Sequence, residues 1–85
     1  MNIFHTDNFL DDFKPLPISI KKLYEKQEGL FLLNWKDHRL HIKKLKKNDS
    51  IFSFRITRRY RVLFTFANED TAFFISIGHR KDIYD

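Results

Sequence analysis

The chain of 85 residues contains no cysteine, only two glycines and only two prolines. Without cysteine it can form neither a disulfide framework nor a thiolate metal site. Small secreted domains commonly depend on such cross-links, so their absence favours a reducing, cytoplasmic location. No apolar run approaches the roughly 18 residues that span a bilayer, and residues 1–7 lack the basic-then-apolar layout of a signal peptide. We therefore expect a cytoplasmic protein with no membrane partner.

The length predicts a single domain over residues 1–85. So short a chain buries only about 60–65% of its unfolded surface, and its hydrophobic core is thin. Ten phenylalanines, one tryptophan and three tyrosines compensate, because each aromatic ring buries a large area.

Positive charge is in excess and is unevenly distributed. Sixteen Lys and Arg against eleven Asp and Glu give a net charge of +5. Acidic residues dominate positions 7–12, whereas basic residues dominate positions 36–47 and 55–61. A basic patch beside aromatic residues favours a polyanionic partner, with RNA or DNA first. The alternative is that the lysine run is only a solvated surface.

The N-terminal third predicts a short strand and a helical hairpin. Residues 2–5 alternate weakly, as in an edge strand, and Thr6 or Asp7 can cap a helix that Pro15 and Pro17 end. A second helix follows these prolines, with apolar residues at three-four spacing. The residues expected on the inner faces are Phe9, Leu10 and Phe13 in the first helix and Ile20, Leu23, Tyr24, Gln27, Leu30 and Phe31 in the second.

The rest of the chain predicts strands. Alternation over residues 40–43 suggests a strand with a basic outer face, and residues 48–50 form a turn. Further strands are expected at residues 51–57, 60–66 and 73–77, where aromatic and β-branched residues alternate.

The register of the hairpin joining the two middle strands decides where the arginines lie. If the apolar positions of both strands share one face, directly opposed residues have numbers of even sum, for example Thr57 with Arg61. The loop is then odd in length, and residues 58–60 fit it. Arg55 and Arg61 then share the face away from the helices, because the other register would bury an unpaired charge among phenylalanines.

The last strand leads into a block of chemically active side chains. Gly78 is expected to break the strand, after which His79, Arg80 and Tyr84 follow within six positions. A proton-transfer group, a fixed positive charge and a phenol at the exit of a strand suit phosphate-ester chemistry. The alternative is a charged tail on a small α+β domain.

Four blocks of this sequence resemble the RelE/ParE superfamily of bacterial toxin–antitoxin toxins. The blocks are LHIKKLK at 40–46, FSFRI at 52–56, YRVLF at 60–64 and IGHRKDIY at 77–84. The resemblance implies an α+β fold, with the N-terminal helical hairpin packed on one face of a small twisted, mainly antiparallel sheet. RelE-like members enter the ribosomal A site and cut messenger RNA, whereas ParE-like members poison DNA gyrase.

We favour the RelE-like branch, which implies the toxin of a type II toxin–antitoxin system acting as a metal-independent endoribonuclease, an mRNA interferase that inhibits translation. The expected partners are a cognate antitoxin, the ribosome and messenger RNA, with no cofactor. The alternatives are a gyrase poison without RNase activity, whose partner would be DNA gyrase, and a non-catalytic nucleic-acid-binding or partner-binding member of the fold.

The resemblance also implies roles for individual residues. Arg61 would neutralise the scissile phosphate, Arg80 would stabilise the charge that develops on it, and Tyr84 would take the 2′-hydroxyl proton or stack on a base. His79 is the alternative acid or base, because imidazole titrates near pH ~6.5. The expected RNA-binding residues are Lys43, Lys44, Lys46, Lys47 and Arg55.

Each of these residues also has a structural alternative. The arginines could form ion pairs, Tyr84 could plug the core, and His79 could be a hydrogen-bonded turn residue. The remaining histidines, His5, His38 and His41, lack metal-ligand spacing and are interpreted as surface or sheet residues. Trp35 is expected to be a hydrophobic lid over the junction of helix and sheet.

Overall fold

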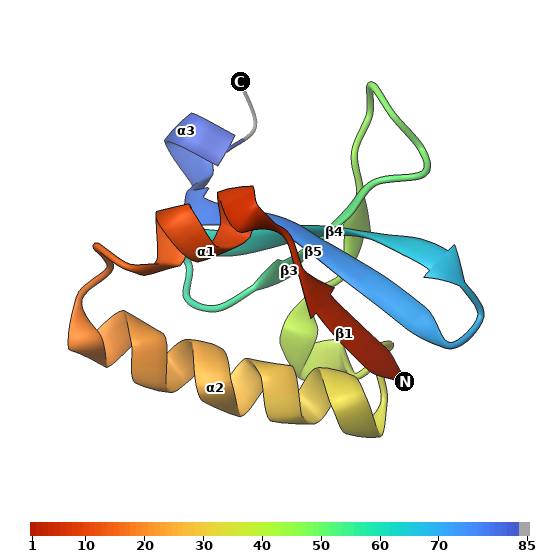
Figure 1. Ribbon diagram of the computed structural model, residues 1–85, viewed down its shortest axis with the longest axis horizontal. Helices are drawn as coiled ribbons and strands as arrows, with labels where there is room; N and C mark the ends of the chain where they lie inside the picture. The colour runs from red at the N-terminus through yellow and green to blue at the C-terminus, as the bar shows by residue number, and fades with distance from the viewer. Residues whose placement is uncertain (84–85) are drawn as a thin grey trace.

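The computed structural model describes residues 1–83, in which helices cover one face of a five-stranded sheet (Figure 1). The helices and the 3-10 turn are α1 (Asp7–Phe13), α2 (Ile18–Leu33), η1 (His38–Leu40) and α3 (Arg80–Ile83). The strands are β1 (Asn2–His5), β2 (Lys43–Lys44), β3 (Phe52–Arg55), β4 (Tyr60–Asn68) and β5 (Thr71–His79). Their order is β1-β5-β4-β3-β2, with β1 parallel to β5 and the other pairs antiparallel. The predicted α+β class, helical hairpin and mainly antiparallel sheet are confirmed.

The helical hairpin begins and turns where the sequence predicts. Thr6 caps α1, because its Oγ1 accepts a hydrogen bond from the Phe9 amide at 3.1 Å. The predicted inner faces are partly wrong, since Leu10 and Leu23 are 45% and 40% exposed. The reason is that α1 and α2 each bury a narrow stripe, which in α2 consists of Tyr24, Gln27 and Phe31.

Aromatic rings fill the space between α2 and the sheet. Phe31 packs edge-on against Phe64 and Phe74, with centroid distances of 5.1 Å in both cases. Trp35 lies edge-on to Phe66 at 4.9 Å and to Phe52 at 5.9 Å. The predicted role of Trp35 as a lid over the junction of helix and sheet is confirmed.

The strand predicted at residues 40–43 is mostly a turn. Leu40 is fully buried and ends η1, and His41 follows with a left-handed φ of 49°. Asp37 caps this turn by accepting a hydrogen bond from the Arg39 amide at 2.9 Å. Because burial of Leu40 and the cap fix the turn, extended geometry begins only at Lys43.

The predicted parity of the β3–β4 hairpin is confirmed, but the example pairing is wrong by two residues. Arg61 lies opposite Arg55 rather than Thr57, and Phe54 lies opposite Val62. Thr57 belongs to the loop, because its Oγ1 accepts hydrogen bonds from the amides of residues 59 and 60 at 3.2 Å each. The apolar positions therefore face the helices, and Arg55 and Arg61 share the other face.

A bulge in β5 changes which residues face the core. Leu63 pairs with Ser76 and Phe64 with Phe74, which leaves Ile75 as an extra residue. Phe74 points into the core before the bulge and Ile77 after it. The simple alternation predicted for residues 73–77 is therefore wrong.

The strand also does not break at Gly78. This residue pairs with Arg61, and β5 continues to His79 before α3 begins. The ladder with β4 supplies partners for this segment, so the glycine remains extended.

Candidate functional site

A groove of about 620 Å³ opens between the segment that follows η1 and the start of α3, on the side of the sheet away from α2 (Figure 1). Its lining residues are Lys43, Lys44, Leu45, Lys46, Lys47, Ser53, Arg61, Arg80 and Lys81. Seven of these nine residues are lysine or arginine, and none is acidic. A concave surface with one sign of charge concentrates the field of its charges, so this cationic groove attracts phosphate groups.

Arg61 lies at the floor of the cationic groove. Its side chain is buried, with 8% of the residue exposed, and its Nη1 donates to the carbonyl of Thr57 at 2.5 Å and to that of Tyr60 at 3.3 Å. These bonds aim the guanidinium along the hairpin. On its other side Arg61 lies opposite Gly78, where a Cβ would meet no atom within 4 Å. The glycine therefore leaves open space beside the arginine.

Arg55 lies directly opposite Arg61 in the sheet. Like charges in this arrangement destabilise a sheet unless another group compensates them. The Nε of Arg55 is buried and has no hydrogen-bond partner among residues 1–83. An anion beside β3 would give this Nε a hydrogen-bond partner.

The rim of the cationic groove comes from two distant parts of the chain. Lys43 and Lys44 form β2, and both are exposed. Across from them, the Arg80 amide donates to the carbonyl of Arg59 at 2.7 Å, which ties the start of α3 to the β3–β4 hairpin. The structure thus brings together Arg61, Arg80 and the four predicted lysines, while Arg55 lies beside Arg61 behind them.

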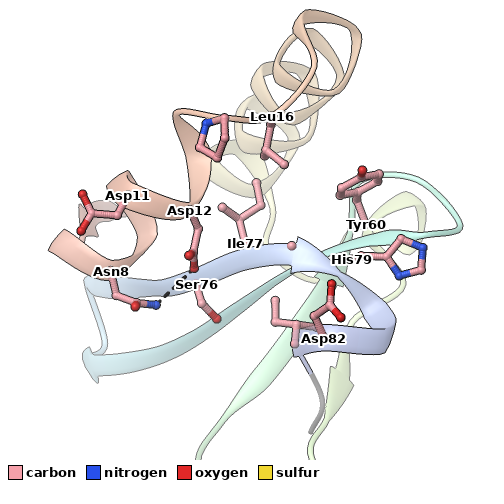
Figure 2. A pocket seen from close by; sticks show the side chains of 12 residues that line it. Asn8, Asp11, Asp12, Leu16, Tyr60, Ser76, Ile77, His79 and Asp82 are labelled. Atoms are coloured by element: carbon pink, nitrogen blue, oxygen red, sulfur yellow. Dashed lines mark hydrogen bonds between the residues drawn. The ribbon is translucent and has the colours of Figure 1, made fainter.

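His79 lies in a different cleft, of about 550 Å³, between α1 and α3 (Figure 2). Its ring packs edge-on against Tyr60 at 5.7 Å, and its Nδ1 accepts a hydrogen bond from the Lys81 amide at 3.1 Å. The residues that line this acidic cleft are Asn8, Asp11, Asp12, Pro15, Leu16, Tyr60, Ser76, Ile77, Gly78, His79, Asp82 and Ile83. Three of them are aspartates and none is lysine or arginine. Tyr84, the other predicted acid–base residue, lies outside the described residues.

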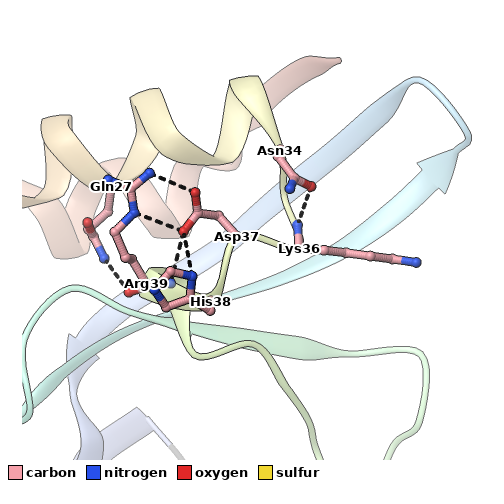
Figure 3. A network of polar contacts seen from close by, with 6 residues as sticks. All are labelled: Gln27, Asn34, Lys36, Asp37, His38 and Arg39. Atoms are coloured by element: carbon pink, nitrogen blue, oxygen red, sulfur yellow. Dashed lines mark hydrogen bonds and ion pairs between the residues drawn. The ribbon is translucent and has the colours of Figure 1, made fainter.

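The η1 turn is held by a polar network of side chains from α2, from η1 and from the segment between them (Figure 3). Arg39 donates to both carboxylate oxygens of Asp37, at 3.0 and 2.8 Å, and these hydrogen bonds hold the pKa of Asp37 well below its usual range. Buried Gln27 donates from one amide nitrogen to the carbonyls of Arg39, at 3.2 Å, and Arg55, at 2.8 Å. One α2 side chain therefore holds η1 against β3.

His41, which the sequence pattern indicated only as a surface or sheet residue, adjoins the arginine pair. Loss of hydration and then the charges of Arg55 and Arg61 lower its pKa. Lys43 pairs with Ser53, and His41 precedes Lys43 by two residues, so its backbone lies near the end of β3 that carries Arg55.

Two kinds of feature are absent from residues 1–83, a metal-binding cluster of side chains and a membrane-spanning helix. In this part of the chain, no group of three or more His, Asp or Glu side chains is arranged to hold a metal ion. None of its helices combines the length and apolar character that crossing a bilayer requires.

No family model and no curated protein matches this sequence, but several solved structures are similar to it. A chain of the RelB–RelE antitoxin–toxin complex from Methanococcus jannaschii aligns with a TM-score of 0.77 and 28% identity, over 96% of this chain and 95% of that one. The YoeB/ParE toxin from Agrobacterium tumefaciens aligns with a TM-score of 0.78 and 14% identity, over 94% and 99% of the two chains. YafQ from E. coli aligns with a TM-score of 0.76 and 11% identity, over 99% and 98%.

The fold is thus that of small toxins from toxin–antitoxin systems. At 14% and 11% identity, the latter two likenesses concern the fold alone. The first, at 28%, extends over nearly the whole of both chains. These likenesses support the resemblance of the four sequence blocks to the RelE/ParE superfamily of toxins.

Proposed function

We propose that this chain is the toxin of a type II toxin–antitoxin pair and that it cleaves messenger RNA on the ribosome without a metal ion. The observation that carries the proposal is the cationic groove, with Arg61 on its floor and Arg80 at its rim. Its volume of about 620 Å³ lies within the range of sites that hold small ligands.

The proposed reaction is intramolecular attack of a ribose 2′-oxygen on the adjacent phosphorus. The P–O5′ bond breaks, and the products are a 2′,3′-cyclic phosphate and a 5′-hydroxyl. Arg61 and Arg80 neutralise the non-bridging oxygens as negative charge develops there. Arginine suits this role because it stays protonated and can donate two parallel hydrogen bonds. DNA lacks the 2′-hydroxyl, so the mechanism selects RNA.

The four lysines of the rim would hold the nucleic acid. Lys43, Lys44, Lys46 and Lys47 are exposed, so their ammonium groups can reach phosphates of messenger RNA or ribosomal RNA. Binding of this kind releases counterions and weakens with salt. These residues would determine affinity rather than the rate of the chemical step.

A cognate antitoxin would neutralise the toxin by covering the cationic groove. The M. jannaschii relative forms a RelB–RelE antitoxin–toxin complex. Charge complementarity favours an acidic, amphipathic segment as the part that covers this groove.

The experiment that tests the proposed function compares two targets of the isolated toxin. Purified chain is added to ribosomes programmed with a defined messenger RNA, and cut positions are mapped by primer extension. In parallel, DNA gyrase is assayed for supercoiling and trapped DNA breaks. We expect cuts within the A-site codon and unaffected gyrase. Intact messenger RNA together with gyrase-linked DNA breaks would overturn the proposal in favour of a gyrase poison.

A further inference from the structure

The proposed cleavage needs a group that removes the proton from the 2′-hydroxyl. The lining residues of the cationic groove are lysines, arginines, Leu45 and Ser53. An ammonium or guanidinium group donates hydrogen bonds and has no lone pair with which to accept a proton. His79 belongs to the acidic cleft, where its Nδ1 accepts a hydrogen bond from the Lys81 amide. Within residues 1–83, the proton acceptor must therefore come from the margin of the groove.

The backbone holds His41 at that margin. One amide nitrogen of Gln27 donates to the carbonyl of Arg39 (Figure 3). The same nitrogen donates to the carbonyl of Arg55, so η1 and the end of β3 lie within reach of one amide group. Fully buried Leu40 anchors the end of η1 in the core. His41 is the next residue along the chain, so its backbone lies near the end of β3 while the residue stays exposed to solvent.

The sheet register gives the same neighbour independently. Lys43 pairs with Ser53 and Lys44 with Phe52. His41 lies two residues before this ladder begins, so its backbone is near the end of β3, where Arg55 pairs with Arg61 and Arg61 with Gly78. Arg55, Arg61 and Gly78 form a lateral row across three strands, and His41 lies close to the Arg55 end of that row.

His41 also has an unusual backbone. Its φ of 49° is the only positive φ among the non-glycine residues of the described chain. This conformation is uncommon for a residue with a side chain, although histidine adopts it more often than most. Such conformations persist where the surroundings enforce them, and they cluster at functional sites.

The charges around His41 suit a proton acceptor. Loss of hydration, then Arg55 and Arg61 on the neighbouring strands and His38 and Lys43 on its own segment, all lower its pKa. The imidazole is therefore uncharged at neutral pH, since its ordinary pKa is already near ~6.5. An uncharged imidazole among cations can accept a proton, whereas its charged neighbours cannot.

We propose that His41 is the general base of this toxin, accepting the 2′-hydroxyl proton while Arg61 and Arg80 hold the scissile phosphate. This inference rests on the proposed RNase function. The imidazole nitrogen takes the proton, the 2′-oxygen bonds to phosphorus, and the 5′-oxygen leaves with a proton from a lysine ammonium of the groove. Solvent then returns a proton to the lysine and removes one from the imidazolium.

The test compares His41→Asn with His38→Asn in the ribosome cleavage assay. Asparagine tolerates a left-handed backbone, so His41→Asn removes the proton acceptor with little change to the turn. His38 provides the matched control, because it lies three residues earlier in the same turn and its side chain is 93% exposed. Circular dichroism and thermal melting of both variants check that they fold. Single-turnover rates are measured from pH 5.5 to 8.5.

We expect His41→Asn to cleave about 100-fold or more slowly, within the range for loss of a general base. The rate of the unsubstituted chain should rise with pH through an apparent pKa below ~6.5, and His41→Asn should lose this limb. Affinity for ribosomes carrying a 2′-deoxy messenger RNA should not change. Added imidazole should restore part of the activity of a His41→Gly variant.

The outcomes separate this inference from the function on which it rests. If the unsubstituted chain cuts no messenger RNA, the proposed function fails and the inference fails with it. If the unsubstituted chain cuts and folded His41→Asn retains its rate and its pH limb, the inference alone is overturned. Equal losses in His41→Asn and His38→Asn would also overturn it, because the effect would then concern the turn and not the imidazole.

Discussion

Two clefts of opposite charge flank the C-terminal end of β5. Seven lysines and arginines line the cationic groove. Three aspartates line the acidic cleft, and none of its lining residues is lysine or arginine. The short helix α3 contributes to both, since Arg80 and Lys81 line the first and Asp82 lines the second. Successive residues on a helix point about 100° apart, so neighbours in the sequence separate in space. A run such as His79 to Asp82 is therefore not one chemical unit.

The contrast between the clefts also changes the meaning of the net charge. A value of +5 describes a mildly basic chain, yet one cleft is lined by lysines and arginines without an acidic residue and the other by aspartates without a lysine or arginine. A polyanion would be drawn to the first and repelled by the second, which favours a single orientation of approach. The predictions below test this division, from the largest expected effect to the smallest.

Replacement of Arg61, on the floor of the cationic groove, should have the largest effect on messenger RNA cleavage. Arg61→Gln should slow messenger RNA cleavage about 100- to 1,000-fold, because it removes charge stabilisation at the phosphate. Arg58→Gln, at an exposed position in the adjacent loop, is the matched control and should retain activity. His79→Gln, in the acidic cleft, should also stay active. If His79→Gln is as slow as Arg61→Gln, the two clefts act as one site.

Reversal of charge at the rim should weaken RNA binding. A double variant with Lys46→Glu and Lys47→Glu should bind a single-stranded RNA about tenfold or more weakly. The slope of log affinity against log salt should shrink by about 0.7 for each phosphate that the protein no longer neutralises. Fluorescence anisotropy over a salt series measures both quantities. The double variant Asp11→Asn with Asp12→Asn should bind at least as well, and a similar weakening there would contradict a groove-specific interaction.

A change on the helical side should affect stability and not activity. The buried Tyr24 hydroxyl donates to Glu28, and the Nε2 of His5 lies 3.0 Å from the same hydroxyl oxygen. Tyr24→Phe should lower the free energy of unfolding by about 1–3 kcal/mol, because Glu28 and His5 lose a buried partner. Urea titration measures this change. Ribosome cleavage below the melting temperature should be unaffected.

Tyr24 also predicts how the stability of the fold changes with pH. Burial, followed by the hydrogen bond to Glu28 and its charge, raises the pKa of Tyr24. The unfolded chain therefore loses this proton first, and stability falls as pH rises above about 10. Tyr24→Phe should show a weaker fall in this range, measured by urea titration at pH 8 and pH 11. An identical fall in both proteins would contradict this assignment.

The smallest effect is expected at Gly78, which pairs with Arg61 in the sheet but lines the acidic cleft. Gly78→Ala should stabilise the chain by about 0.4–1 kcal/mol, because the new methyl group meets open space and the unfolded chain loses freedom. Cleavage should fall if a phosphate occupies this space and stay constant if it does not. Thermal melting and the cleavage assay distinguish the two effects.

The features that sequence could predict are those set by local chemistry. Thr6 as a cap, the two prolines between the helices and the even-sum register of the hairpin all follow from neighbouring residues. The register in particular led to the shared face of Arg55 and Arg61, and the resemblance pointed to Arg80 and the lysines.

The features that sequence missed depend on distant contacts. At the bulge, the carbonyl of Ile75 accepts two hydrogen bonds. The donors are Thr6 Oγ1, at 2.8 Å, and Asn8 Nδ2, at 3.2 Å. Those donors lie 69 and 67 residues away in the chain, so no periodicity near Ile75 reveals them. The turn at His41 similarly depends on Gln27, which binds the carbonyl of Arg55 from another helix.

The bulge has a consequence for comparing sequences within this superfamily. Strand side chains alternate between the two faces, so one extra residue exchanges the faces of everything that follows it. In this chain the extra residue sets Gly78 opposite Arg61 and His79 opposite Tyr60. A relative of the same length without the bulge would keep the register of the first half of β5, so that the residue at the position of Ile77 lies opposite the arginine and the glycine lies opposite the tyrosine. Functional alignments must therefore count from the bulge, because residues aligned with Gly78 and His79 need not share their partners on β4.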